Sequence, residues 1–258
     1  MDLGLQGLRV MLTAGAAGIG LAIARAFVRE GARVELCDVD DGALASIAAS
    51  DPMLGRWHCD VSQRDDVRRF FDGALAALGG LDCLVNNAGI AGPTGRIEEI
   101  DPEAWDRCLA VDLTGQFNCI RHAVPALRAS ANASIVNVSS LAGRLGFPLR
   151  TPYAAAKWGV IGLTRSLAAE LGADGIRVNA LLPGIVAGDR QRRVLEAKAQ
   201  ARGVSYETME TLAFSFTSIK EYVTADQLAD LVVFVASPRA RTISGQLLSV
   251  CGDTNMLA

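Results

Sequence analysis

Several features that would assign the sequence to other classes of protein are missing. No apolar run reaches the roughly 18 residues that a membrane-spanning helix needs. The first residues lack the basic stretch and cleavage site of a signal peptide, so we expect a cytoplasmic protein. A net charge of −3 argues against a nucleic-acid partner. None of the six cysteines stands in a CxxC pair, so we expect free thiols, no disulfides and no metal site.

What remains is an apolar chain of moderate length. Half of its 258 residues are hydrophobic and 21% are charged, enough to bury one sizeable core. No linker or low-complexity segment interrupts it, so we expect one domain over 1–258. The mean hydropathy of +0.27 is high for a chain without a membrane span, and we expect the surplus apolar surface to lie in subunit contacts.

Short β-type runs alternate with helical ones along the chain. This rhythm predicts an α/β fold with a doubly wound, seven-stranded parallel sheet and helices on both faces. The expected strands are 8–13, 32–38, 54–60, 81–89, 134–140, 176–184 and 245–253. The expected helices are 18–31, 62–79, 102–129, 152–172 and 224–237, the last with Thr224 as N-cap. The polar segment 188–222 is irregularly helical.

The glycine-rich stretch "TAGAAGIG" (13–20) joins the first strand to the first helix. Gly15, Gly18 and Gly20 allow a close approach of the backbone to a phosphate, and the helix N-terminus offers free N–H groups. This position at the start of the fold predicts dinucleotide binding, although an ordinary tight turn is the alternative.

An acidic residue ends the second strand, 18 residues after Gly20. A carboxylate at Asp38 would accept hydrogen bonds from the adenosine ribose and would repel a 2′-phosphate, which predicts NAD rather than NADP. The alternative is a solvated aspartate in the turn "CDVDD". Asp60 and Val61 follow the third strand and are expected near the adenine, a role compatible with a place in the helix N-cap region.

The stretch "YAAAK" places Tyr153 and Lys157 four residues apart, on one face of an apolar helix. Taken alone, the two could form a surface pair with the lysine reaching toward solvent. A phenol ionises only near pH 10, but an ammonium about 4 Å away stabilises the phenolate by roughly 4 kcal/mol at an effective dielectric near 20. The pair can therefore supply a proton acceptor at neutral pH.

These motifs occur in the order found in short-chain dehydrogenases/reductases, and the sequence resembles that family along nearly its whole length. The resemblance rests on the glycine loop, Asp38, "NNAG" (86–89), Ser140, "YAAAK" and "RVNALLPG" (177–184). It implies a single-domain Rossmann fold, a nicotinamide cofactor, and oxidation of an alcohol or reduction of a carbonyl. It also implies that Ser140 holds the substrate oxygen, that Tyr153 is the general acid/base, and that Lys157 contacts the nicotinamide ribose. The implied cofactor-binding residues are Gly15, Gly18, Ile19, Gly20, Asp38, Asp60, Val61, Asn87, Ala88, Gly89, Tyr153, Lys157, Pro183, Gly184 and Val186.

The sequence departs from the family at three positions. Ala14 stands where the family usually has Gly, and we expect Gly15 to take the positive φ instead. Asp112 stands where the family has an Asn that holds a proton-relay water through its main-chain carbonyl, and we expect Asp112 to keep that catalytic role. Gly188 stands where the family often has a Thr that contacts the carboxamide of the nicotinamide. We expect the backbone around Ile185 and Val186 to substitute for it.

Two segments are expected to contact the substrate. The segment 188–222 is expected to close over it, and its mixed charge is typical either of a solvated face or of a lid whose arginines meet an anionic group. Arg150 is the best candidate for such a contact. Ser140, Leu141, Ala142, Arg150 and Tyr153 are the expected substrate residues, with Phe147 and Trp158 as further apolar wall. The apolar helices 102–129 and 152–172 predict subunit contacts, and the resemblance implies a homotetramer, with a dimer as the alternative.

The leading functional prediction is an NAD-dependent dehydrogenase acting on a secondary alcohol. A carbonyl or 3-oxoacyl reductase is the first alternative, but it would favour a basic residue where Ala16 and Ala17 stand. The second alternative is a non-catalytic NAD(H)-binding regulatory protein. The intact Ser, Tyr and Lys set disfavours it.

Overall fold

All seven strands of the computed structural model, which describes residues 2–257, run parallel in one sheet of order β3-β2-β1-β4-β5-β6-β7. The strands are β1 Arg9–Thr13, β2 Arg33–Asp38, β3 Leu54–His58, β4 Cys83–Asn86, β5 Ser134–Val138, β6 Arg177–Pro183 and β7 Leu247–Val250. The predicted doubly wound sheet is confirmed. Its order reverses between β1 and β4, where a crevice opens beyond the carboxyl ends of the strands.

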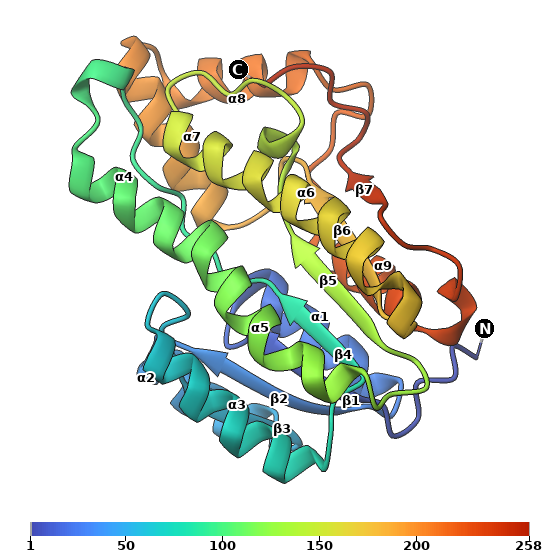
Figure 1. Ribbon diagram of the computed structural model, residues 1–258. Coiled ribbons are helices and arrows are strands. Elements are labelled where there is room, and N and C mark those ends of the chain that lie inside the picture. The colour runs from blue at the N-terminus through green and yellow to red at the C-terminus, as the bar shows by residue number, and fades with distance from the viewer. Residues whose placement is uncertain (1, 258) are drawn as a thin grey trace.

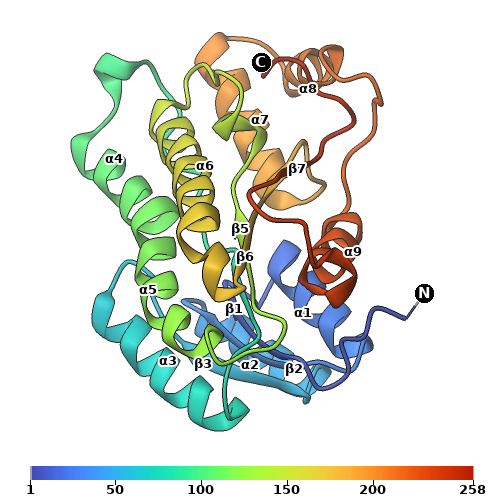
Figure 2. The same ribbon diagram turned by 45° about the vertical axis from the view of Figure 1, so that its right-hand side comes forward.

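Helices cover both faces of the sheet (Figures 1 and 2). They are α1 Gly18–Arg29, α2 Asp41–Ser50, α3 Arg64–Leu78, α4 Pro102–Leu109, α5 Gly115–Leu127, α6 Thr151–Leu171, α7 Asp189–Arg202, α8 Tyr206–Ser215 and α9 Ala225–Ala236. Helices α1, α2 and α9 enclose one apolar cluster, which includes Phe27 and Val232. Helices α3 and α5 enclose a second large cluster, which includes Phe70 and Ile120. The central strands are buried on both sides as a result, as their continuous apolar sequences predict.

Two features of the helices differ from the sequence prediction. Helix α2 was not predicted, although Asp40 caps it through a hydrogen bond from Ala43 N–H and Leu44 and Ile47 face the core. The long helix expected over 102–129 is interrupted at Ala110–Thr114 by a turn of π-helix. Such turns widen a helix locally and are common at functional sites. This one carries Asp112.

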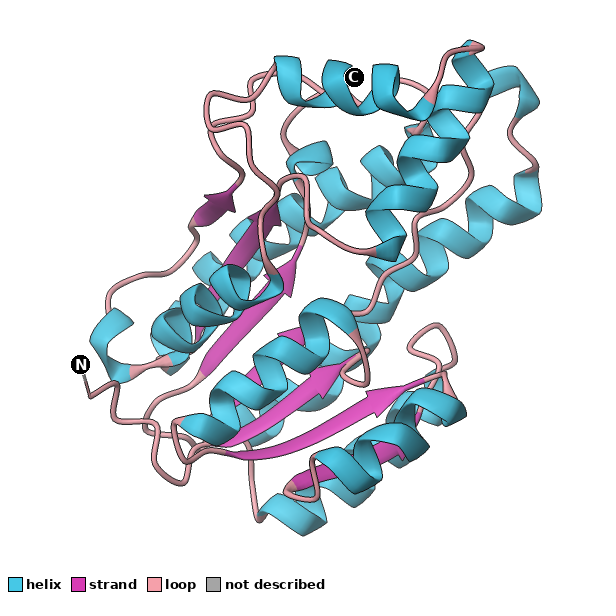
Figure 3. Cartoon of the chain, turned by 180° about the vertical axis from the view of Figure 1, so that it is seen from behind, coloured by secondary structure: helices cyan, strands magenta, loops and turns pink. Residues whose placement is uncertain are grey.

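The segment 188–222 contains α7 and α8, which lie at the end of the molecule toward which β5 and β6 point (Figures 1 and 3). Thr224 caps α9 as predicted, with Gln227 completing a reciprocal capping pair. Throughout residues 2–257, no helix combines the length and apolarity needed to cross a bilayer.

Candidate active site

A cavity of about 550 Å³ occupies the crevice at the carboxyl ends of the strands. Its walls come from the glycine loop, the end of β5, the first turns of α6, the segment after β6, and α7. Predicted site residues that line it are Gly18, Ile19, Gly20, Asp38, Asn87, Gly89, Ser140, Leu141, Arg150, Tyr153, Lys157, Pro183, Gly184 and Val186. The fold thus brings most of them to a single place.

The glycine loop presents an uncapped helix end to this cavity. Helix α1 begins at Gly18, and its N-cap residue, Ala17, accepts no side-chain hydrogen bond. The first N–H groups of α1 therefore remain free to bind an anion, and the helix dipole favours one there. A Cβ on Gly20 would lie 2.0 Å from the Ala14 carbonyl oxygen, whereas a Cβ on Gly18 would meet nothing within 4 Å. Gly20 keeps the helix close to the loop, and the space at Gly18 is open to a phosphate.

The expectation that Gly15 takes the positive φ is wrong. Ala14 itself has φ 52°, and Gly15 is not among the residues with positive φ. The Ala14 carbonyl is held by the Asn87 side chain, whose Nδ2 donates to it at 2.9 Å. Gly15 is needed for a different reason, because a Cβ there would lie 2.7 Å from the Cβ of Leu36. The chain therefore keeps an alanine in the left-handed region, at a cost of order 1–2 kcal/mol.

Asp38 lines the cavity at the end of β2 with its carboxylate held by the backbone. Its Oδ1 accepts from the N–H groups of Val39 at 2.8 Å and Asp40 at 3.2 Å, and its Oδ2 accepts from Ala16 N–H at 3.1 Å. These donors orient the carboxylate and stabilise its charge.

Asp60 and Val61 lie outside the cavity lining. Val61 is buried, and the Asp60 carboxylate pairs with Arg107 at 2.9 Å and accepts from the Ser62 N–H and hydroxyl. Hydrogen bonds from Ser62 and Arg107 lower the Asp60 pKa against the opposing effect of burial. Ala88 is likewise buried, and its N–H donates to the Thr13 hydroxyl at 3.0 Å.

The three residues expected to carry the chemistry lie together in the cavity. The Lys157 ammonium is 5.5 Å from the Tyr153 ring centroid and donates to the Val138 carbonyl at 3.2 Å. Ser140 follows β5 and accepts from Ala142 N–H at 3.1 Å. The preceding Ser139 donates instead to the Lys157 carbonyl at 2.9 Å and so ties the end of β5 to α6.

Asp112 stands directly behind Lys157. Its side chain is fully buried, with Oδ2 3.4 Å from the Lys157 ammonium and Oδ1 accepting from Ile90 N–H at 2.6 Å. The role expected through its main-chain carbonyl remains a prediction. The structure shows in addition that the Asp112 carboxylate forms an ion pair with Lys157.

The backbone after β6 has donors and acceptors for a carboxamide. The Val223 N–H donates to the Ile185 carbonyl at 2.8 Å, and the Val223 carbonyl accepts from the Ala187 N–H at 2.9 Å. Backbone groups alternate in direction along an extended segment, so those of Val186 face the cavity. They make no hydrogen bond within residues 2–257. Gly188 lines the cavity without a side chain.

The predicted substrate residues separate into three groups. Leu141, Arg150 and Phe147 line the cavity, whereas Ala142 is buried behind it. Trp158 is 51% exposed on α6 and is not part of the cavity wall.

Sequence reasoning counted Arg190, Arg193 and Lys198 among the mixed charges of the segment 188–222 but assigned none of them individually to the site, and the structure places both arginines on the cavity wall. Arg190 lines the cavity and donates to the Gly89 carbonyl at 3.0 Å. Lys198 is buried on α7, a helix whose charge pattern suggested a solvated face. The sequence carries one signal for the burial of Lys198, because this lysine lies on the same side of α7 as the apolar residues Leu195 and Ala199.

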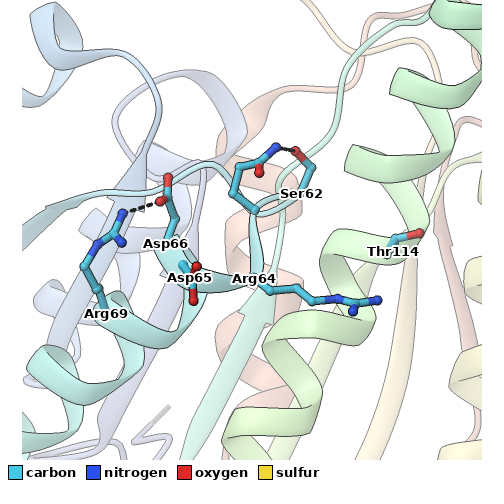
Figure 4. A pocket seen from close by; sticks show the side chains of 7 residues that line it. Ser62, Arg64, Asp65, Asp66, Arg69 and Thr114 are labelled. Atoms are coloured by element: carbon cyan, nitrogen blue, oxygen red, sulfur yellow. Dashed lines mark hydrogen bonds and ion pairs between the residues drawn. The ribbon is translucent and has the colours of Figure 1, made fainter.

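A second hollow lies at the N-terminus of α3 (Figure 4). Two pairs of side chains around it interact with each other: Arg69 pairs with Asp66, and Gln63 donates to the Ser62 hydroxyl. Among residues 2–257, no group of three or more His, Cys, Asp or Glu side chains is placed to hold a metal ion.

Comparison with known proteins decides the family. The family model described as enoyl-(acyl carrier protein) reductase matches residues 14–253. The chain is 37% identical to cis-4-hydroxycyclohexanecarboxylate dehydrogenase of Sinomonas cyclohexanicum and 34% identical to 2-(S)-hydroxypropyl-CoM dehydrogenase 3 of Xanthobacter autotrophicus, each match covering 94% of both chains. It belongs to the short-chain dehydrogenases/reductases. A solved structure of a single-substitution variant of actinorhodin polyketide ketoreductase with NADPH shares a TM-score of 0.89 at 31% identity, covering 95% of this chain and 96% of that one.

As a short-chain dehydrogenase/reductase, the protein is an oxidoreductase that interconverts alcohols and carbonyls. A bound nicotinamide cofactor supplies the hydride or accepts it. The residues present fit that group: the free end of α1 for the pyrophosphate, Asp38 for the ribose, and the Val186 backbone for the carboxamide. With the group bound there, Tyr153 on the cavity wall would be the residue to exchange a proton with the reacting oxygen.

Proposed function

We propose that this chain is an NAD-dependent dehydrogenase that oxidises a small secondary alcohol. The observation that carries the choice of NAD is the Asp38 carboxylate, which lines the cavity and is fixed by three backbone N–H groups. A fixed anion accepts hydrogen bonds from two ribose hydroxyls and repels a 2′-phosphate. Cellular NAD⁺ then favours the oxidative direction.

In the proposed reaction, Tyr153 takes the proton of the alcohol while Ser140 donates a hydrogen bond to the same oxygen. Lys157 stabilises the ionised phenol because its ammonium lies beside the Tyr153 ring. Together these residues hold the alcohol oxygen and remove its proton.

The test compares NAD⁺ with NADP⁺ on a panel of secondary alcohols, sugars and hydroxy acids, followed by NAD(P)H absorbance. We expect a kcat/KM for NAD⁺ at least about tenfold above that for NADP⁺, and a reduced ratio in Asp38→Ala. Asp41→Ala is the matched control, because its exposed carboxylate lies three residues away and pairs with His58. A wild-type preference for NADP⁺ would contradict the proposal.

A carbonyl or 3-oxoacyl reductase is the second candidate. It is favoured by the description of the matching family model and by the solved ketoreductase with NADPH. The same cofactor comparison separates the two candidates, since the reductase is expected to prefer NADPH.

We further propose a homotetramer, with a small-molecule substrate and no nucleic-acid or membrane partner, in the cytoplasm. Support for assembly comes from large apolar side chains left exposed on α5 and α6, Phe117 at 45% and Trp158 at 51%. Light scattering of the purified chain tests the subunit number. A monomer would remove this part of the proposal.

A further inference from the structure

Two positively charged side chains are buried around the ring of Phe147 without an anionic partner in the described part of the chain. Arg150, which precedes α6, is 2% exposed, and Lys198 on α7 is 1% exposed. Both lie against the Phe147 ring, with Lys198 Nζ 4.0 Å and Arg150 Cζ 5.5 Å from its centroid. None of the ion pairs formed among residues 2–257 includes either side chain.

Most of their polar atoms also lack hydrogen bonds. Arg150 donates from Nη2 to the Ala91 carbonyl, but its Nε and Nη1 and the Lys198 Nζ are buried without a partner in the described chain. A buried, unpaired charge is strongly unfavourable and is retained in folded proteins mainly where something pairs with it. Two such charges in one place point to an anion that binds there.

The backbone before Arg150 is itself strained. Leu149 has φ 65°, a conformation that side chains rarely adopt, and its carbonyl accepts from Gly95 N–H at 3.0 Å. Strain of this kind persists where the surrounding structure enforces it, and it collects at functional sites. Here it precedes Arg150, which lines the cavity.

We propose that Arg150 binds a carboxylate of the substrate directly, and that Lys198 attracts the same carboxylate as a second positive charge. The proposal rests on the proposed function, and it names the substrate class as hydroxy acids and the corresponding oxo acids. Arg150 Cζ is 5.4 Å from the Tyr153 ring centroid, so the carboxylate lies a few bonds from the carbon that reacts. Lys198 is not on the cavity wall, but Phe147, on which it packs, is.

The two cations come from different parts of the fold. Arg150 belongs to the loop between β5 and α6, whereas Lys198 belongs to α7 in the segment expected to form a lid. Packing on an aromatic ring does not neutralise an ammonium, so the field of Lys198 reaches the cavity through a poorly screening interior. A carboxylate in the cavity would therefore hold the segment 188–222 against the rest of the site.

Binding of propionate and of propionamide to the NADH-loaded protein tests the proposal, because these probes are alike in shape and differ in charge. Titration calorimetry at about pH 6 is expected to show propionate binding at least about tenfold tighter than propionamide. Arg150→Met should weaken propionate at least about tenfold, and Lys198→Met about threefold or more, with propionamide unchanged. Arg192→Met is the matched control: it removes an exposed charge from α7 and should leave both affinities as they are.

A second measurement uses the wild-type chain alone and so does not depend on the folding of any variant. Burial and the nearby Arg202 and Arg150 lower the Lys198 pKa to about 7. On α8, which packs on α7, Glu210 is bonded to Tyr206 and Tyr222 and pairs with neither cation. A bound carboxylate should therefore draw a proton onto Lys198 at about pH 8, seen as a binding enthalpy that depends on the ionisation enthalpy of the buffer.

Equal affinity for propionate and propionamide, or propionate binding that both variants retain in full, would overturn the proposal. Binding without proton uptake at about pH 8 would remove Lys198 from it. These results are distinct from failure of the proposed function. A protein that oxidises neutral alcohols with NAD⁺ but ignores propionate refutes only the carboxylate site, whereas propionate binding without turnover of any alcohol refutes only the dehydrogenase.

Discussion

Replacing Lys198 by methionine is expected to stabilise the protein, although it removes a side chain that is fully enclosed. Lys198 is 1% exposed, and its pKa is lowered from 10.5 to about 7 by burial first and by Arg202 and Arg150 second. The unfolded chain carries this lysine charged at pH 7, whereas the folded chain resists the charge. Since a tenfold change in a protonation equilibrium is worth about 1.4 kcal/mol, keeping Lys198 costs folding roughly 3 to 5 kcal/mol at pH 7.

The sign of the pH dependence follows from the lowered pKa. Between about pH 7 and 10.5 the unfolded chain binds more protons than the folded chain, so the stability of the wild type rises with pH in this window. The penalty is complete below pH 7 and vanishes near pH 10.5. Methionine cannot titrate, so the advantage of Lys198→Met should be largest at about pH 7 and below and should shrink toward about pH 10.

Thermal unfolding in a zwitterionic buffer of low chloride measures the effect without a bound anion. A gain of roughly 3 kcal/mol corresponds to a Tm higher by about 6–12 °C for a chain of this size. Adding propionate should raise the Tm of the wild type toward that of Lys198→Met, because it supplies the missing counter-charge. Arg192→Met should change the Tm little. A lower Tm for Lys198→Met at about pH 7, or a gap that stays the same at about pH 10, would refute the reasoning.

The remaining predictions concern the site itself. Ala14→Gly should raise stability by about 1 kcal/mol, seen in urea unfolding, because glycine removes the strain of a positive φ. Tyr153→Phe should lower kcat by at least about a hundredfold and leave NADH binding unchanged by fluorescence titration; retained turnover would refute its role. Asp112→Asn removes the negative charge 3.4 Å from Lys157, so the pH at which kcat/KM is half-maximal should fall. An unchanged pH profile would show that Asp112 does not act on the reacting group through its charge.

The sheet was predictable because its central strands are largely apolar and the segments between them are punctuated by glycine and aspartate. Parallel order and right-handed crossovers then leave few topologies. Helix α2 escaped prediction because its mixture of Ala, Ser and Asp gives little periodicity, and its capping residue Asp40 stands in a run of acids that also fits a turn.

The cofactor side of the site was predictable because its motifs are short and local. The glycine loop, Asp38 and the Tyr153–Lys157 pair each depend on spacing within a few residues, and the fold brings them to the same crevice. The substrate side depends on contacts between distant segments. Nothing in the sequence places Lys198 on the ring of Phe147, which belongs to a loop far earlier in the chain.

The charges around Tyr153 connect the departure at Asp112 with the cation at Arg150. Asp112 places a negative charge 3.4 Å from the Lys157 ammonium, which is itself 5.5 Å from the Tyr153 ring centroid. Arg150 Cζ lies 5.4 Å from the same centroid and restores a positive charge beside the phenol.

A substrate carboxylate bound to Arg150 would cancel the positive charge that Arg150 places beside the phenol. The phenol should therefore ionise less readily with a hydroxy acid bound than with a neutral alcohol. We therefore expect the half-maximal pH of kcat to lie higher for a hydroxy acid than for its amide. Arg150→Met should abolish this difference, and equal profiles in the wild type would show that the substrate charge does not reach the phenol.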